Sequence, residues 1–176
     1  MVLNEKLWWP TRKGKNDINS YDEFPRASWC YGSPGIANAL YDSASLLKDS
    51  KTQKNAEKGI LTLTKIDTKK LDLNSATICH GFSGLLLCVE NINRKMHNAN
   101  LKYFEDKITS KIMELADYDY DFMFRNYDYP TPFKLGSKEI FQDDIGFLTG
   151  STGVVLTLIN RKYENNDNWL KMLALY

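Results

Sequence analysis

The feature that most constrains this fold is a short glycine turn that occurs three times along the chain. The copies span Gly32–Gly35, Gly81–Gly84 and Gly150–Gly153, and an aliphatic stretch follows each of them. A structural unit that repeats along a sequence cannot bury its apolar face alone, and it buries that face against neighbouring units. The sequence therefore predicts a repeat protein.

Apolar residues recur at helical spacing after the first two turns and predict two helical hairpins. In the first hairpin, Ser33 is expected to act as the N-cap and Pro34 as the first helical residue. Its second helix is expected over residues 52–66. The apolar stripes of the four helices are, in order, Ile36, Leu40, Tyr41, Ala44 and Leu47; Ala56, Ile60 and Leu63; Phe82, Leu85, Leu86, Val89, Ile92 and Met96; and Leu101, Phe104, Ile108, Ile112 and Leu115.

Two shorter apolar stripes follow the third turn. They are formed by Val155, Leu158 and Ile159, and by Trp169, Met172, Leu173 and Tyr176. No segment shows the alternating pattern of a strand, so the sequence predicts an all-α fold.

Two segments interrupt the helical units. Residues 1–25 contain Trp8, Trp9 and Phe24 without a helical period, and are expected to form an irregular arm that lies on the helices. Residues 117–132 are expected to form a long loop over one face of the array. The helical domain that carries the functional site is accordingly assigned to residues 26–176.

Composition and charge narrow the classes of function. A net charge of +1 provides no basic excess for nucleic acid. The sequence has no secretory-type start, and its longest aliphatic run, residues 85–89, is too short to span a bilayer. A cytoplasmic protein without a transmembrane segment is expected. Three cysteines in such a chain favour metal binding or free thiols over disulfides.

Metal-ligand side chains stand just before two of the glycine turns. Cys30 precedes the first turn, and Cys79 with His80 precedes the second. Similar turns at the ends of neighbouring helices are expected to bring the three side chains together. Zn²⁺ takes thiolate and imidazole ligands in a tetrahedron, and a catalytic site leaves one position open. The sequence predicts an open zinc site of this kind, with a purely structural role for each residue as the alternative.

Other candidate sites are weaker. Cys88 lies inside the helix after the second turn and is expected in the core, while His97 lies beyond that helix and is expected on the surface. Residues 117–121 carry alternating aspartates like a calcium loop, but Phe122 stands where that loop needs glycine. The glycine turns lack the lysine of a phosphate loop and follow no strand, so nucleotide binding is not predicted.

Three motifs resemble those in the carboxy-terminal part of the lanthionine synthetase C-like family, the cyclases that form thioether rings in lantibiotic peptides. The motifs are Arg26–Ile36, Cys79–Gly81, and Gly146–Gly150 followed by Gly153, in the family's order. The resemblance implies an α/α toroid of alternating inner and outer helices, of which about three hairpin units are present. It places the zinc ligands at Cys30, Cys79 and His80 and an active-site arginine at Arg26.

The resemblance also implies a reaction and partners. A cysteine of a dehydrated precursor peptide would add to dehydroalanine or dehydrobutyrine, with zinc ionising the thiol and Arg26 stabilising the enolate. The dehydratase and the export transporter of a lantibiotic pathway would be partners, in a complex bound to the membrane.

The resemblance leaves alternatives open. The family's further active-site histidine and aspartate stand before the arginine, whereas the histidines of this sequence are His80 and His97. The chain is then a fragment of a longer cyclase, a truncated product, or a degenerate zinc-binding scaffold that binds peptide without full catalysis. Completion of the toroid by a second chain is a further alternative. For Arg26 the alternative role is a surface or structural ion pair.

Overall fold

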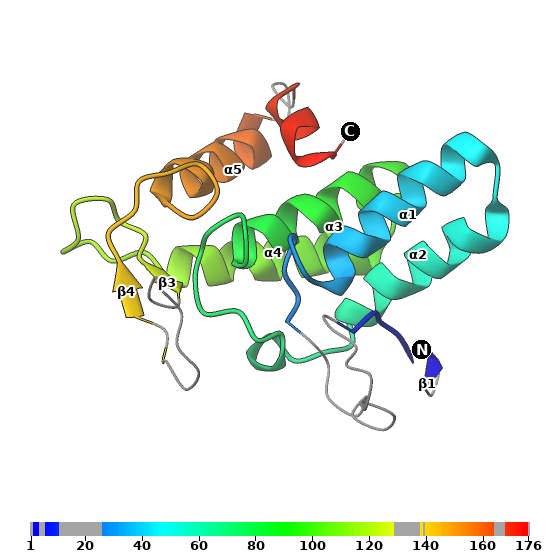
Figure 1. Ribbon diagram of the computed structural model, residues 1–176, viewed down its shortest axis with the longest axis horizontal. Coiled ribbons are helices and arrows are strands. Elements are labelled where there is room, and N and C mark those ends of the chain that lie inside the picture. The colour runs from blue at the N-terminus through cyan, green and yellow to red at the C-terminus, as the bar shows by residue number, and fades with distance from the viewer. Residues whose placement is uncertain are drawn as a thin grey trace.

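The computed structural model describes residues 2–3, 6–10, 26–128, 138, 140–163 and 168–175. Its centre is formed by two helical hairpins, α1 (Ser33–Leu47) with α2 (Ser50–Leu63), and α3 (Phe82–Met96) with α4 (Ala99–Glu114). Figure 1 shows α5 (Ser151–Tyr163) beside α3, on the side away from α1. The predicted helical units are therefore present and lie next to one another in chain order.

The second helix of the first hairpin begins and ends earlier than residues 52–66. It begins at Ser50 because the Asp49 carboxylate accepts the backbone N–H groups of Lys51 and Thr52, each at 3.1 Å. Such an N-cap satisfies donors that have no partner within the helix. A second difference concerns α1, where Leu47 of the predicted stripe is exposed near the end of the helix.

The second glycine of each turn closes the turn against the segment before it. A Cβ atom would lie 2.0 Å from the Trp29 carbonyl oxygen at Gly35, 1.9 Å from that of Ile78 at Gly84, and 1.9 Å from that of Phe147 at Gly153. Only glycine allows the backbone to approach this closely. The same contact three times confirms that the turns are structural repeats.

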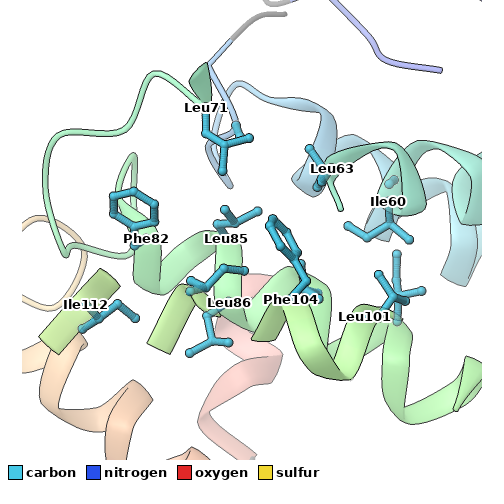
Figure 2. Close-up of a cluster of buried hydrophobic side chains, with 14 of the residues drawn as sticks. Ile60, Leu63, Leu71, Phe82, Leu85, Leu86, Leu101, Phe104 and Ile112 are labelled. Atoms are coloured by element: carbon cyan, nitrogen blue, oxygen red, sulfur yellow. The ribbon is translucent and has the colours of Figure 1, made fainter. Parts of the chain in front are cut away.

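The main core lies between the two hairpins. Figure 2 shows side chains from three helices gathered in it, among them Ile60 of α2, Leu85 of α3 and Phe104 of α4. Leu71, from the connection between the hairpins, is fully buried against the same cluster. Burying a side chain of this size stabilises the folded state by about 1.5–3 kcal/mol. The cluster contains the apolar residues predicted to face the core on α2, α3 and α4, and it therefore confirms those stripes.

Part of the N-terminal arm packs on the first hairpin. Trp8 is buried, and the Trp9 ring lies against α2, where a Cβ on Gly59 would be 2.4 Å from it. The Trp9 backbone N–H donates to the Ser33 hydroxyl at 2.9 Å. The prediction that Ser33 caps α1 is wrong, because its hydroxyl holds the arm and the N-cap is Gly32.

The stripe predicted on α5 is only partly buried. Val155 and Ile159 are 45% and 47% exposed, whereas Leu158 packs against the core. The buried face of α5 lies at neighbouring positions with mostly small or polar side chains, namely Ser151, Gly153, Val154, Thr157 and Asn160.

The last predicted stripe forms a short 3₁₀ helix, η2 (Asn168–Leu173), instead of an α-helix. With three residues per turn, Leu170 and Leu173 share the buried side and Met172 is exposed. Tyr176 of this stripe lies outside the described residues.

Two pairs of short antiparallel strands correct the expectation of a chain without strands. β1 (Val2–Leu3) pairs with β2 (Lys6–Leu7), and β3 (Asn126–Asp128) pairs with β4 (Ile140–Gln142). β3 lies inside the predicted long loop, and Tyr127 stacks edge-on with Phe141 across the pair, with ring centroids 6.4 Å apart. Such cross-strand contacts stabilise a pair too short to show a sequence pattern. Phe24 and residues 129–137 lie outside the described residues.

None of the described helices combines the length and the apolar character needed to cross a bilayer.

Candidate metal and thiol site

Backbone hydrogen bonds join the three glycine turns. The N–H of Cys30 donates to the Cys79 carbonyl oxygen at 3.3 Å, and the N–H of Cys79 donates to the Leu148 carbonyl oxygen at 2.8 Å. These three residues hold the same position, two residues before the first glycine of each turn. The repeat therefore places Cys30 and Cys79 side by side, as predicted.

The thiols of Cys30 and Cys79 lie close enough to affect each other's ionisation. The pKa of Cys30 is lowered to about 6, chiefly because Cys79 donates to its sulfur, with help from the Ser28 hydroxyl and the His80 imidazole and against the effect of partial burial. The same hydrogen bond, with partial burial, raises the pKa of Cys79. These opposite shifts favour ionisation of Cys30 over ionisation of Cys79, and the thiolate is the form that binds metals.

His80 is buried beside this pair and bonds to the β3 strand. Its side chain is 7% exposed, and Nε2 lies 3.3 Å from the Tyr127 carbonyl oxygen. Because a carbonyl oxygen only accepts, Nε2 carries the proton in this contact, and Nδ1 is the nitrogen left to bind a metal. Metal-binding histidines are commonly oriented in this way by a carbonyl oxygen on the other ring nitrogen.

The structure brings two of the three predicted ligands into contact. Across the described ranges, no group of three or more His, Cys, Asp or Glu side chains is arranged closely enough to hold a metal ion. Cys30 and Cys79 meet, whereas the His80 ring is engaged with Tyr127. The donor set nevertheless fits zinc in its chemistry, because sulfur and imidazole nitrogen are the ligands that zinc prefers.

Arg26 lies on the segment that leads into the first turn and forms an ion pair. Its Nε is 3.3 Å from Oδ2 of Asp72, and the two side chains are 25% and 68% exposed. The Ala27 N–H donates to the Leu71 carbonyl oxygen at 2.9 Å, which holds the Arg26 segment beside the Asp72 loop. The surface ion pair weighed as the alternative for Arg26 is thus present, and it fixes one edge of the guanidinium.

The two other candidate ligands lie where the sequence predicts. Cys88 is fully buried in α3, and burial raises the pKa of its thiol. His97 is exposed and ends α3 in the left-handed backbone region, with φ of 51°. Neither lies at the thiol pair.

Two contacts of the site are not among the predictions made from the sequence. The Ser28 hydroxyl is 3.8 Å from the Cys30 sulfur, and the Tyr127 carbonyl oxygen meets His80 from a segment 47 residues away. Ser28 belongs to the first motif and is detectable by its place two residues before Cys30. The Tyr127 contact uses a backbone atom, for which side-chain patterns contain no signal.

Comparison with known proteins identifies the family. The family model described as lanthionine synthetase C-like protein matches residues 2–174. The chain belongs to this family. Its Cys30, Cys79 and His80 stand in the motifs by which the sequence resembles lanthionine synthetase C-like proteins.

Two related proteins support the fold assignment. The chain is 30% identical over 160 residues to the nisin biosynthesis protein NisC of Lactococcus lactis subsp. lactis, covering 87% of this chain and 31% of NisC. A solved nisin cyclase structure matches 90% of this chain and 33% of its own, with 22% identity and a TM-score of 0.62. The chain therefore spans about a third of these relatives, and the expected all-α toroid is confirmed as an arc of helices.

Proposed function

We propose that this chain carries the zinc-binding part of a lanthionine-forming cyclase that acts on dehydrated peptides. The observation that carries the proposal is that Cys30 and Cys79 lie side by side at the junction of two repeat turns, joined by a backbone hydrogen bond. Family membership and the relationship to NisC support a peptide substrate. The dehydratase and the exporter of the same pathway are proposed as partners.

Cys30, Cys79 and His80 would hold the zinc ion. When bound, zinc supplies the positive charge that keeps a substrate cysteine ionised near neutral pH. His80 would use Nδ1, because the Tyr127 carbonyl oxygen holds Nε2–H. Ser28 would keep the Cys30 sulfur oriented through its hydroxyl.

The proposed reaction adds a cysteine S–H across the double bond of dehydroalanine or dehydrobutyrine. The sulfur bonds to the β-carbon, negative charge passes to the carbonyl oxygen as an enolate, and a proton completes the α-carbon, so no group leaves. Arg26 is proposed to stabilise the enolate oxygen, since a guanidinium stays charged at every relevant pH. Its ion pair with Asp72 would restrict where the guanidinium can point.

A second candidate is a zinc-ordered module that binds peptides without turnover. One observation favours it: Arg26 is already paired with Asp72. In that case the metal would order the turns and contribute to folding.

Metal analysis and a cyclisation assay separate these functions. We expect one zinc ion per chain, lost in Cys30→Ala and Cys79→Ala and kept in the matched control Cys88→Ala. We also expect Arg26→Ala to keep zinc and to lower the rate at which thiols of a dehydrated peptide disappear. Zinc retained by both site variants would refute the metal site, and turnover by the unchanged chain would exclude the module that binds peptides without turnover.

A further inference from the structure

A groove lies between α2 and α4, and its lining includes neither the paired thiols nor His80. It has a volume of about 370 Å³, which is within the range of ligand-binding sites in proteins. Figure 2 shows Ile60 of α2 beside Leu101 of α4, and these core residues are the sequence neighbours of Leu61 and Asn100, which line the groove. We call this space the α2–α4 groove.

Three lysines at the groove carry uncompensated charge. Lys54, Lys58 and Lys65 line it, and within the described part of the chain none of them forms an ion pair or a side-chain hydrogen bond. The one carboxylate of the lining is Glu57. Three lysines and one glutamate give this small region a formal charge of +2, whereas the whole chain has +1.

Lysines on the neighbouring helices are paired instead. Lys95 of α3 forms an ion pair with Asp42, and Lys111 of α4 forms one with Glu114. The positive charge of the α2–α4 groove is therefore a local feature and is not shared by every lysine of the helices.

An asparagine adds a neutral donor to the groove. The Asn98 Oδ1 already accepts the N–H groups of Asn100 and Leu101, at 2.9 and 3.2 Å. Its side-chain nitrogen makes no hydrogen bond with a described residue and lines the groove with the three ammonium groups. A ligand with several anionic acceptors would complement this set of donors.

The spacing of two lysines fits an extended peptide. Lys54 and Lys58 are four residues apart on α2, which separates them by about 6 Å along the helix axis. In an extended chain, side chains two residues apart point to the same side and lie about 6.6 Å apart. Carboxylates at alternate positions of a peptide could thus meet both lysines.

We propose that the α2–α4 groove binds an acidic peptide segment in extended conformation, with its carboxylates held by Lys54, Lys58 and Lys65. The partly buried Leu61 and the methylene stems of the lysines would contact the peptide between its charges. A concave groove encloses a peptide, whereas a flat membrane surface would meet only its edges. The source of the peptide rests on the proposed function, under which the segment belongs to the substrate away from its reacting cysteine.

The test is calorimetric titration of the full chain with the peptide acetyl-Glu-Ser-Glu-Ser-Glu-amide. We expect saturable binding that weakens with added salt, and none for the matched peptide with glutamine in place of glutamate. The peptide acetyl-Ser-Glu-Glu-Glu-Ser-amide has the same charge and should bind more weakly, because neighbouring side chains of an extended chain point to opposite sides. The triple variant Lys54→Gln, Lys58→Gln, Lys65→Gln should bind the first peptide about tenfold more weakly.

A matched control separates the groove from net charge. The triple variant Lys138→Gln, Lys162→Gln, Lys171→Gln removes three exposed lysines outside the groove and lowers the net charge equally. It should bind the acidic peptide as the unchanged chain does. Equal weakening by the two triple variants would overturn the proposal, and so would equal affinity for the two peptides that contain three glutamates.

The outcomes are independent of the cyclisation assay, because the probe has neither a cysteine nor a dehydroamino acid. Absence of saturable binding would overturn the proposal even if the chain forms thioether rings. Binding that persists in Cys30→Ala would support it even if the chain forms none. Binding to vesicles that contain phosphatidylserine, without binding of the acidic peptide, would assign the lysines to a membrane surface and overturn the peptide site.

Discussion

Arg161 of α5 donates to Glu90 of α3, and the same Nη1 lies 3.3 Å from Glu105 of α4. The three side chains are only 15%, 11% and 5% exposed. One guanidinium thus ties together three helices from two repeat units. Removing one partner of a buried ion pair leaves an uncompensated charge, which costs more than the pair contributed.

We therefore expect Arg161→Met to lower the free energy of unfolding by about 3 kcal/mol, measured by urea denaturation. The matched control is Lys111→Met, which removes an exposed pair with Glu114 and should cost no more than about 0.5 kcal/mol. The double variant Arg161→Met, Glu90→Gln should recover part of the loss. Equal effects of Arg161→Met and Lys111→Met would show that the buried cluster does not join the units.

The contact between Cys30 and Cys79 predicts a selective oxidation. Because a backbone hydrogen bond holds the two residues side by side and their thiols interact, we expect diamide to form a Cys30–Cys79 disulfide in metal-free protein, seen by mass spectrometry as the loss of two hydrogens. Bound zinc should slow this reaction, since the thiolates would be engaged. Cys88→Ala should oxidise normally because Cys88 is buried in α3, and Cys79→Ala should not form the bridge. A disulfide that includes Cys88 would contradict the arrangement of the turns.

The close approach at Gly84 predicts a large effect of a single methyl group. A Cβ there would lie 1.9 Å from the Ile78 carbonyl oxygen, so Gly84→Ala must displace backbone and should cost about 1–3 kcal/mol of unfolding free energy. Gly59→Ala is the control, because its methyl group meets the edge of the Trp9 ring instead. Its gain in helix propensity, about 1 kcal/mol, should offset much of the ring displacement. An equal loss of unfolding free energy in Gly59→Ala and Gly84→Ala would contradict the special role of the turn.

The Asp49 cap predicts a dependence of stability on pH. Its hydrogen bonds to Thr52 and Lys51 hold the pKa of Asp49 below its ordinary value of 3.8. With the folded pKa depressed, the stabilisation is fully present above the unfolded pKa and is lost as the pH falls through the folded pKa. We expect the urea midpoint of Asp49→Asn to vary less with pH in this acidic range than that of the unchanged chain.

Asn98 supplies the control for this titration. It caps α4 with the same pair of backbone hydrogen bonds, to Asn100 and Leu101, but has no titratable group. Asn98→Ala should therefore lower stability by a similar amount at acidic and neutral pH. A pH-independent difference between Asp49→Asn and the unchanged chain would contradict the assignment of the cap.

Comparison of the predicted and observed α5 shows where periodicity fails. Val155 and Ile159 belong to the apolar stripe predicted for that helix, yet they are exposed, while Thr157 and Asn160 are buried. Thr157 satisfies its hydroxyl by donating to the Gly153 carbonyl oxygen at 2.8 Å. Small and polar residues can thus face a neighbouring helix where the backbones are close, and hydrophobic spacing does not report that distance.

The sequence by itself determined the repeat, the helical hairpins and the register of the two cysteines. These follow from local chemistry, because a glycine turn and an apolar stripe act over a few residues and recur in each unit. The tertiary structure decided the rest: that Ser33 holds Trp9, that Tyr127 holds His80, and that Arg161 joins α5 to its neighbours. Those contacts join residues 24 to 71 positions apart, often through backbone atoms, and only the packing of the helices brings them within hydrogen-bond distance.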